Sequence, residues 1–375
     1  MTSRLTRRSF VAGLLAAPVV AACGGGDDSP AVDGTPTSAG PTTATTGAVV
    51  PPPTVPETVP PTAPPPPPSG IAPLTGAPAD ASLLSRPALV VKIDNADGPG
   101  GVARPQAGIG SADVVFEEMV EGSVTRFASV FHSTDGGDVG PIRSGRDTDI
   151  LIFSELDHPL FAWSGGNAET AAHIRSSPIV DIGVDVQPGA YHRRSSRSAP
   201  HNLYSDTATL FSLAPAGSVP PPALFSFREP GEPAAGTPAA GVHVEYRNPE
   251  GVVAALAPVE HRWNPDTGGY PRTQRGTPHV DEDGNVFQPS NVVVQFVSYT
   301  PTGGADVAGN HVFVAGLVGD GDVWVFTGGN QLVGRWHKGS AEEVTTFSDA
   351  GGQPLRLSVG RTWVLLAPIG GARLL

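Results

Sequence analysis

Apolar runs of strand length recur along the chain once its proline-rich start has passed. Residues 88–94, ALVVKID, form a short continuous apolar run that is typical of a buried strand. Residues 112–133 contain two β-rich runs on either side of Glu121–Gly122, and this pattern predicts a hairpin. A two-residue turn at that point would place Glu117 directly opposite Arg126 on the neighbouring strand.

Two helices are predicted among these strands. Residues 147–157 have a helical pattern, and Asp147 and Asp149 suit its first turn because the positive end of the helix dipole attracts carboxylates. Residues 159–177 predict a strand, a glycine turn and a helix, with Asn167 as the residue that caps the N-terminus of that helix.

A change of composition divides the globular part of the chain. Between about residues 210 and 240 the sequence becomes rich in proline and alanine, which predicts a domain boundary. Beyond this boundary the apolar runs are all of strand type and are separated by glycine and aspartate turns. The predicted fold class is α+β: a mixed α/β N-terminal domain over 71–225, followed by a mostly antiparallel, β-rich C-terminal domain over 240–375.

The first 22 residues, 1–22, have the layout of a secretory signal. Three arginines precede an apolar stretch that is too short to span a bilayer, and Ala21–Ala22 stands just before Cys23. Cys23 is the one cysteine of the sequence, so it has no partner for a disulfide. With the glycines and aspartates that follow, it resembles a bacterial lipobox, in which the cysteine is acylated and becomes the new N-terminus. We expect a lipid on Cys23 that anchors the chain to the outer face of the cell membrane.

Export and tethering follow from the same part of the sequence. The pair Arg7–Arg8 resembles a twin-arginine export signal, and the sequence leaves open whether export uses that route or the general secretory one. Residues 23–70 are rich in Pro, Thr, Ala and Gly and predict a disordered tether. Cleavage would remove three arginines and no acidic residue, so the net charge would fall from −13 to −16. Such an acidic chain is a poor nucleic-acid binder, and we expect no nucleic-acid partner.

Polar residues gather at the ends of the predicted strands of the first domain. Loops with arginine, aspartate and asparagine at strand ends are common places for binding sites, and arginines beside carboxylates can hold a sugar, a peptide carboxylate or a phosphate. A glycine pair before a helix, as in the WSGGN turn at 163–167, exposes backbone N–H groups to an anion. The candidate ligand-binding residues are Asp94, Asn95, Glu117, Glu118, Arg126, Arg143, Arg146, Asp149, Ser164, Asn167, His201 and Asn202.

Several of these residues have a purely structural alternative. Glu117 with Arg126 is explained by a cross-strand ion pair, and Asp149 by its place at the start of a helix. Ser164 could act as a nucleophile with His201 as its base, but the sequence lacks the G-x-S-x-G elbow. The ten histidines show no spacing typical of metal ligands, so neither a metal nor another cofactor is expected.

Short segments in both domains resemble the YerB-like family of bacterial lipoproteins. They are VVKIDN, ARPQAGIGSADVVFEEMVEGSVTRF, GPIRSGRDTDI, WSGGN and APHNLY in the first domain, and GTPHVDEDGN, NVVVQFV, GRWHKGS and GRTWVLLAP in the second. The resemblance extends in order from about residue 71 to residue 370. It implies a two-domain extracytoplasmic lipoprotein of unknown function, and it supplies no agreed catalytic residues.

We expect a binding protein rather than an enzyme: a lipid-anchored head that binds a cell-wall component or an envelope protein through the polar face of its first domain. The alternative is a hydrolase directed at the cell wall, which would need paired carboxylates such as Asp94, Glu117 or Glu118. A third hypothesis is a solute-binding lipoprotein with a cleft between its domains. A raised carboxylate pKa inside a cleft would favour the enzyme, whereas carboxylates paired with cations would favour binding.

Overall fold

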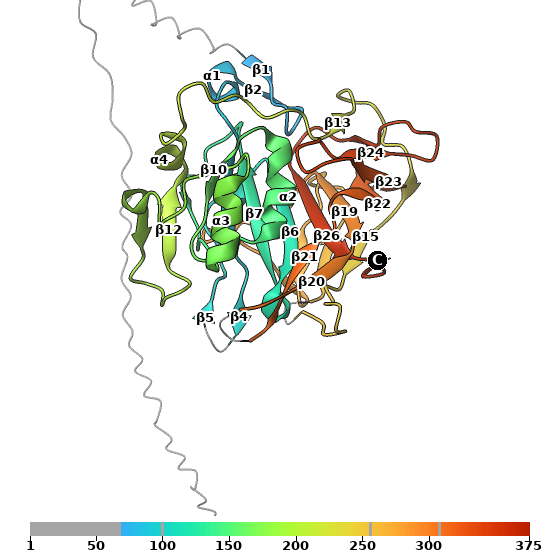
Figure 1. The fold of residues 1–375 in the computed structure, drawn as a ribbon. Coiled ribbons are helices and arrows are strands. Elements are labelled where there is room, and N and C mark those ends of the chain that lie inside the picture. The colour runs from blue at the N-terminus through green and yellow to red at the C-terminus, as the bar shows by residue number, and fades with distance from the viewer. Residues whose placement is uncertain (1–68, 99–100, 255–256, 307–308) are drawn as a thin grey trace, which may run out of the picture. The chain divides into compact units, whose positions relative to one another are not determined.

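The computed structural model describes residues 69–98, 101–254, 257–306 and 309–375 (Figure 1). The predicted signal, Cys23 and the tether as far as residue 68 lie outside the described residues. Within the described ranges, no helix combines the length and the apolar character that crossing a membrane requires. Residues 69–225 are called the first half below, and residues 226–375 the second half.

A mixed sheet of eleven strands runs through both halves (Figure 1). In spatial order its strands are β10 (Val180–Asp181), β9 (Leu160–Ala162), β3 (Leu89–Asp94), β7 (Val124–Phe131), β6 (Val114–Val120), β26 (Thr362–Pro368), β19 (Asn291–Val297), β22 (Gly319–Thr327), β23 (Asn330–Lys338) and β14 (Thr237–Pro238), and β24 (Thr346–Ser348) also pairs with β23. The first five come from the first half and the others from the second. The two halves therefore build one continuous sheet.

The halves meet where β6 pairs with β26. This pairing is parallel and extends from Val114 with Thr362 to Glu117 with Leu365. β26 also runs parallel to β19, so the strands of the second half are not all antiparallel, although β19, β22 and β23 pair in the predicted antiparallel manner. A strand held between two parallel neighbours is usually covered on both faces, and the run TWVLLAP of β26 is buried almost throughout.

Helices are few and short, and in the described part of the chain the α-helices all belong to the first half. They are α1 (Ala81–Leu84), α2 (Asp147–Phe153), α3 (Ala168–Ser176) and α4 (Thr207–Phe211). α2 and α3 lie across one face of the sheet (Figure 1). Their starts are as predicted: Asp147 and Asp149 stand in the first turn of α2, and the Asn167 side chain accepts a hydrogen bond from the Thr170 amide of α3. The described chain as a whole is mostly β.

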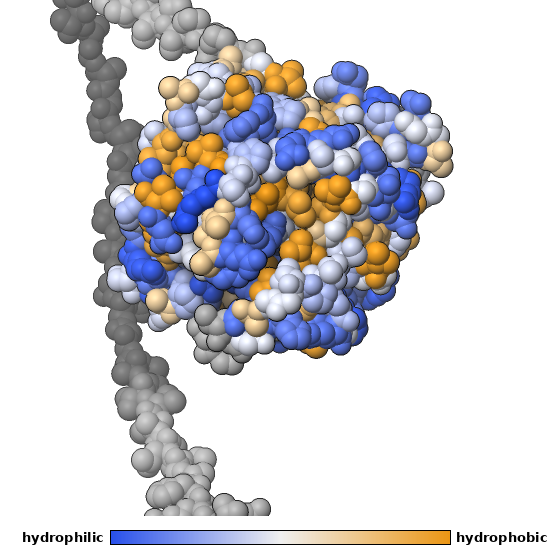
Figure 2. Space-filling view, in the orientation of Figure 1, coloured by the Kyte–Doolittle hydropathy of each residue, from blue (hydrophilic) through white to orange (hydrophobic). Residues whose placement is uncertain are grey.

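A second, antiparallel sheet covers the opposite face. Its strands are β18 (Thr277–Pro278), β17 (Arg272–Gln274), β16 (Val259–Arg262), β15 (Gly241–Val244) and β27 (Ala372–Leu374). It packs on the main sheet where the His261 ring of β16 lies 5.6 Å from the Trp363 ring of β26. Buried side chains from both halves form one hydrophobic core. On the surface seen in Figure 2, apolar residues lie in separate patches among hydrophilic ones.

Further small sheets border these layers. They are β1 (Ser69–Ile71) with β2 (Pro78–Asp80), β4 (Asp97–Gly98) with β5 (Gly101–Val102), β12 (Leu203–Asp206) between β11 (Tyr191–Arg193) and β8 (Asp138–Val139), β13 (Ser226–Phe227) with β25 (Arg356–Leu357), and β20 (Tyr299–Ala305) with β21 (His311–Ala315). The β20–β21 hairpin approaches the β6–β7 turn, where a Cβ on Gly122 would lie 3.6 Å from the Asn310 side chain.

The β6–β7 hairpin turns through three residues, Glu121–Ser123, and not through two. Gly122 supplies the left-handed backbone conformation that this turn needs, with a φ of 73°. The longer turn shifts the register by one residue, so Glu118 lies opposite Arg126. The predicted pairing of Glu117 with Arg126 is wrong. Because side chains alternate along a strand, the shift directs Glu117 to the other face of the sheet.

Candidate functional site

Three charged side chains form a cluster between the main sheet and α2. Lys92 of β3 donates from Nζ to Asp149 Oδ1 over 2.6 Å, and it also pairs with Glu118 of β6. All three side chains are completely buried. Burial raises the pKa of Glu118 to about 7. The charge of Lys92 lowers this pKa, but the neighbouring Asp149 carboxylate raises it again and so offsets part of the lysine's effect. The second oxygen of Asp149 caps α2 by accepting from the Arg146 amide at 2.7 Å.

Asp94 lies at the end of β3 between a histidine and an arginine. Its Oδ2 is 2.6 Å from His201 Nδ1 and 3.0 Å from Arg143 Nε, and 1% of its side chain is exposed. Burial alone would raise the pKa of Asp94, but the His201 hydrogen bond and the charges of Arg143 and Arg126 outweigh burial and lower that pKa. Asp94 is therefore an ionised and paired carboxylate, which is a poor general acid.

Three arginines line the edge of this region. Arg146 Nε donates to Glu121 Oε2 over 2.6 Å, and a second guanidinium nitrogen pairs with the other oxygen of the same carboxylate. Arg126 lies 3.9 Å from Glu121 Oε1, and its Nε is buried without a hydrogen-bond partner among the described residues. Arg143 is the most open of the three, with 22% of its side chain exposed. We call Arg126, Arg143 and Arg146 the arginine edge.

The WSGGN turn lies against the loop that carries Arg143. The Ser164 amide donates to the Arg143 carbonyl over 2.9 Å, and residues 165–167 are exposed. Asn202, on the loop that carries His201, accepts a hydrogen bond from the exposed Arg193 of β11 over 2.6 Å. Among the described residues Ser164 makes no hydrogen bond to His201, so the hypothesis of a serine nucleophile with a histidine base gains no support.

Glu117 belongs to a separate cluster on the opposite face of the sheet. Both of its oxygens accept from Arg272 of β17, at 2.9 and 3.0 Å, and neither side chain is exposed. Thr125 donates to Glu117 and accepts from Asn95 Nδ2, each over 2.8 Å. Two of the predicted site residues, Glu117 and Asn95, therefore lie apart from the others.

A chain of hydrogen bonds connects this second cluster to Asp94. Arg272 donates to His279 Nδ1 at 2.5 Å, His279 Nε2 donates to Gln106 at 2.8 Å, and Gln106 donates to the Asp94 carbonyl at 2.9 Å. Burial and the charge of Arg272 lower the pKa of His279 well below its usual value, so the ring is neutral and can accept and donate at once. Arg272 and His279 are not among the predicted residues, because 155 positions separate Arg272 from Glu117 and no local pattern connects them.

Replacing His261 with asparagine should change how stability depends on pH. Burial and the charge of Arg272 lower the pKa of His261 to about 3, from an ordinary value of 6.5. Below pH 6.5 the unfolded chain takes up a proton that the folded chain refuses, so this contribution to stability is complete above pH 6.5 and is lost as the pH falls towards 3. The asparagine amide can keep the bond that His261 Nδ1 makes to the Tyr270 carbonyl.

Between about pH 6 and pH 4, the wild type should lose about 1.4 kcal/mol more stability per pH unit than His261→Asn does. Denaturant unfolding of both proteins at several pH values measures this difference. Parallel stability curves would contradict the expectation.

The structure brings most of the predicted site residues to the helix-covered face of the sheet. Those residues are Asp94, Glu118, Arg126, Arg143, Arg146, Asp149 and His201. Ser164, Asn167 and Asn202 lie at the rim of this group. In the part of the chain that the structure describes, no group of three or more His, Cys, Asp or Glu residues is placed to hold a metal ion.

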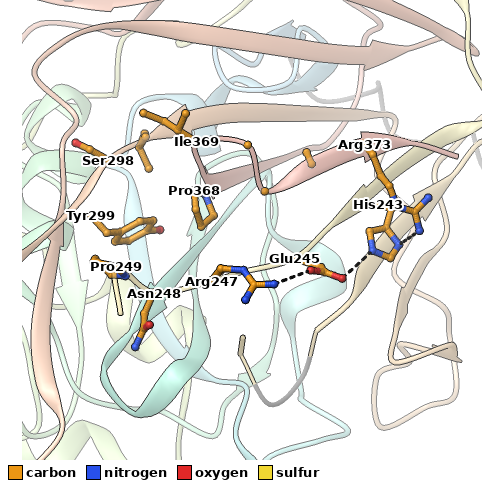
Figure 3. Close-up of a pocket in the computed structure, with 14 residues that line it drawn as sticks. His243, Glu245, Arg247, Asn248, Pro249, Ser298, Tyr299, Pro368, Ile369 and Arg373 are labelled. Carbon is orange, nitrogen blue, oxygen red and sulfur yellow. Dashed lines mark hydrogen bonds and ion pairs between the residues drawn. The ribbon is translucent and has the colours of Figure 1, made fainter. Parts of the chain in front are cut away.

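Two open hollows of the second half lie outside the predicted site residues. They flank the turn Pro368–Gly371 and have volumes of about 500 and 650 Å³. In the smaller one, drawn in Figure 3, a row of polar side chains runs from Arg247 through Glu245 and His243 to Arg373, with separations of 3.5, 3.7 and 3.1 Å. Sequence patterns do not reveal either hollow, because several separate segments line each of them.

The fold and the charge clusters define a class of protein: a β-rich head in which two chain segments complete one sheet around buried ion pairs. Two family models match this chain, the N-terminal domain of "Protein of unknown function (DUF3048)" over residues 74–218 and the C-terminal domain over residues 252–364. The chain belongs to this two-domain family of unknown function. The matched segments fall within the predicted domains 71–225 and 240–375.

This chain is similar to a Bacillus subtilis protein both in sequence and in structure. The Bacillus subtilis (strain 168) protein named "Putative lipoprotein YerB" is 30% identical over 135 residues, which are 36% of this chain and 39% of that protein. The match thus spans about two fifths of the relative's length. The crystal structure of YerB protein from Bacillus subtilis has the same fold, with a TM-score of 0.68 and 24% identity over 81% of this chain and 99% of that one. The predicted resemblance to the YerB-like family is confirmed.

Proposed function

We propose that this protein is extracytoplasmic, is anchored by a lipid on Cys23, and binds a cell-wall component or an envelope protein through the arginine edge. Its export-type N-terminus and its similarity to a protein named as a lipoprotein support this location. In this proposal the first half acts as an α/β binding domain, and the second half is its β-rich support.

The observation that carries the proposal is the pairing of the buried carboxylates. Asp94, Glu117 and Glu118 each have a cationic or histidine partner, and at most 1% of each side chain is exposed. A carboxylate in this position cannot reach a glycosidic or peptide bond of a wall polymer. The raised pKa of Glu118 does not favour an enzyme either, because this residue lies between α2 and the sheet and none of its side chain is exposed.

The arginine edge has the chemistry of an anion site. Guanidinium groups recognise carboxylates and phosphates through charge-assisted hydrogen bonds. Arg143 is partly exposed, and the exposed glycine turn beside it adds backbone N–H groups. The solute-binding alternative has less support, because β6 and β26 join the two halves in one sheet and a closing motion would have to bend or break it.

Replacing Arg143 with alanine should weaken binding by about tenfold or more, which is the value of one charge-assisted hydrogen bond. The test uses residues 24–375, the chain without its signal and Cys23, mixed with purified cell-wall sacculi. The bound fraction after sedimentation is measured against protein concentration. Asp94 keeps its His201 partner in this variant, so the fold should survive, and thermal unfolding checks that it does.

A matched control is Arg356→Ala, which removes an arginine that is half exposed and pairs with Glu232 far along the chain from Arg143. This variant should bind like the wild type. Equal binding by Arg143→Ala would remove the arginine edge from the site. Release of soluble wall fragments by the wild type would favour the hydrolase. If the wild type neither binds sacculi nor releases fragments, a wall ligand is excluded, and crosslinking should then be used to search for an envelope protein partner.

Replacing Cys23 with serine should abolish lipid attachment and shift the protein from the membrane fraction to the soluble or unprocessed fraction. Carbonate washing of membranes, followed by immunoblotting, measures the distribution. The acylated cysteine is the expected anchor, so a Cys23→Ser protein that stays in washed membranes would exclude it.

A further inference from the structure

An aromatic side chain borders the larger hollow of the second half. Trp324 of β22 lies opposite Val333 of β23, and the Phe296 ring packs edge-on against the Trp324 ring at 5.1 Å. Val333 is 60% exposed, and Val318 at the mouth of the hollow is also exposed. An aromatic ring and its aliphatic neighbours therefore face an open space of about 650 Å³, which is within the range of ligand pockets.

Polar side chains continue along the same face of β22 and β23. Because alternate residues share a face, Asp322 and Asp320 follow Trp324 along β22, and each meets a partner on β23. Asp322 is 2.5 Å from Arg335, and Asp320 is 2.9 Å from His337. All four side chains are more than half exposed. Ion pairs this exposed are weak, so their donors and acceptors can turn to a ligand at little cost.

The larger hollow continues into the one drawn in Figure 3. The two share Ser298, Ile369, Gly370 and Ala372 as lining residues. Ile369, at the crest of the turn between them, is 75% exposed. The two adjoining hollows together are called the groove below, and a ligand long enough to occupy both would cross this crest.

From these features we infer that the groove binds a neutral glycan chain. The C–H face of a sugar ring packs on the negative face of an aromatic ring such as Trp324, and sugar hydroxyls both donate to carboxylates and accept from guanidinium groups, here Asp322 and Arg335. Acidic and basic side chains are mixed along the groove, which gives no preference for a strongly charged ligand. β19 pairs with β22 only over Val323–Thr327, so a peptide strand at the Gly319–Asp322 edge is the alternative that the peptide arm of the test below distinguishes.

This inference does not depend on the arginine edge, which lies on the first half. The test is calorimetric titration of residues 24–375 with chitohexaose and with cellohexaose. The wild type should bind at least one of them, Trp324→Ala should bind at least tenfold more weakly, and Trp324→Phe should retain most of the affinity. Val333→Asp places a charge beside the ring at an exposed position, so it tests the groove without touching the core, and it should also bind at least tenfold more weakly.

Arg356→Ala is again the control and should bind like the wild type. The inference is overturned if neither oligosaccharide binds at millimolar concentration, or if Val333→Asp and a folded Trp324→Ala bind as the wild type does. It is also overturned if an extended peptide binds with the same dependence on Trp324 and the oligosaccharides do not compete. Normal oligosaccharide binding by an Arg143→Ala protein that no longer binds sacculi would show that the two sites act separately.

Discussion

Replacing Lys92 with methionine is expected to lower the free energy of unfolding by about 3–5 kcal/mol. Lys92 is the cation that faces Glu118 and Asp149, and all three side chains are buried. Methionine has a similar length but no charge, so it would leave two carboxylates in the protein interior without their ammonium partner. Guanidinium unfolding of residues 24–375, followed by tryptophan fluorescence, measures the loss.

A double variant separates the charge effect from a packing effect. Lys92→Met combined with Glu118→Gln should recover part of the lost stability, because one of the two unpaired charges is removed and Asp149 still accepts from the Arg146 amide. A loss below about 1 kcal/mol in Lys92→Met, or a double variant no more stable than the single one, would contradict this account of the cluster.

Replacing Arg272 with methionine should cost a similar amount, about 3–5 kcal/mol, on the other face of the sheet. The Arg272 guanidinium donates to both oxygens of Glu117 and to His279. The side chains of Arg272 and Glu117 are both completely buried. Because both halves share one sheet and one core, the whole head should lose stability in one transition and not in two. Denaturant unfolding followed by fluorescence and by circular dichroism tests both the size of the loss and its cooperativity.

Two further variants show whether the stability lost in Arg272→Met comes from the unpaired Glu117 charge. Replacing both Glu117 and Arg272 with methionine removes the buried charges as a pair, and buried ion pairs replaced in this way often lose little or no stability. Arg356→Met, at an exposed ion pair, should change stability by less than about 1 kcal/mol. A separate early transition of the second half in Arg272→Met would show that the halves unfold independently.

Local features of the fold could be predicted because they depend on neighbours in the sequence. The buried strand at 89–94, the helix that begins at Asp147 and the Asn167 cap all occur where the pattern predicts them. The hairpin around Gly122 was also predictable, but its length was not, because two- and three-residue turns can both contain a glycine in the left-handed region. That one residue decides which glutamate faces which side of the sheet.

In the candidate site, too, local segments could be predicted from the sequence, whereas contacts between distant segments could not. The sequence alone indicated the polar segments of the first half, and Asp94, Arg143 and His201 do meet, although His201 is 107 positions from Asp94. It did not indicate that Arg272 is the partner of Glu117, nor that two hollows flank Pro368–Gly371. Partners and hollows of this kind depend on how distant segments pack.

The sequence by itself determined the family of this protein, the longer strands of its main sheet and the starts of α2 and α3, because caps and hydrophobic periodicity act over a few residues; the export signal and the lipid on Cys23 stay predictions. Only the tertiary structure decided that both halves share one sheet, that Glu117 and Glu118 lie on opposite faces, and that the candidate acids are buried with partners. The physical reason is that strand pairing, burial and ion pairing are long-range properties, and each depends on contacts between residues far apart in the chain.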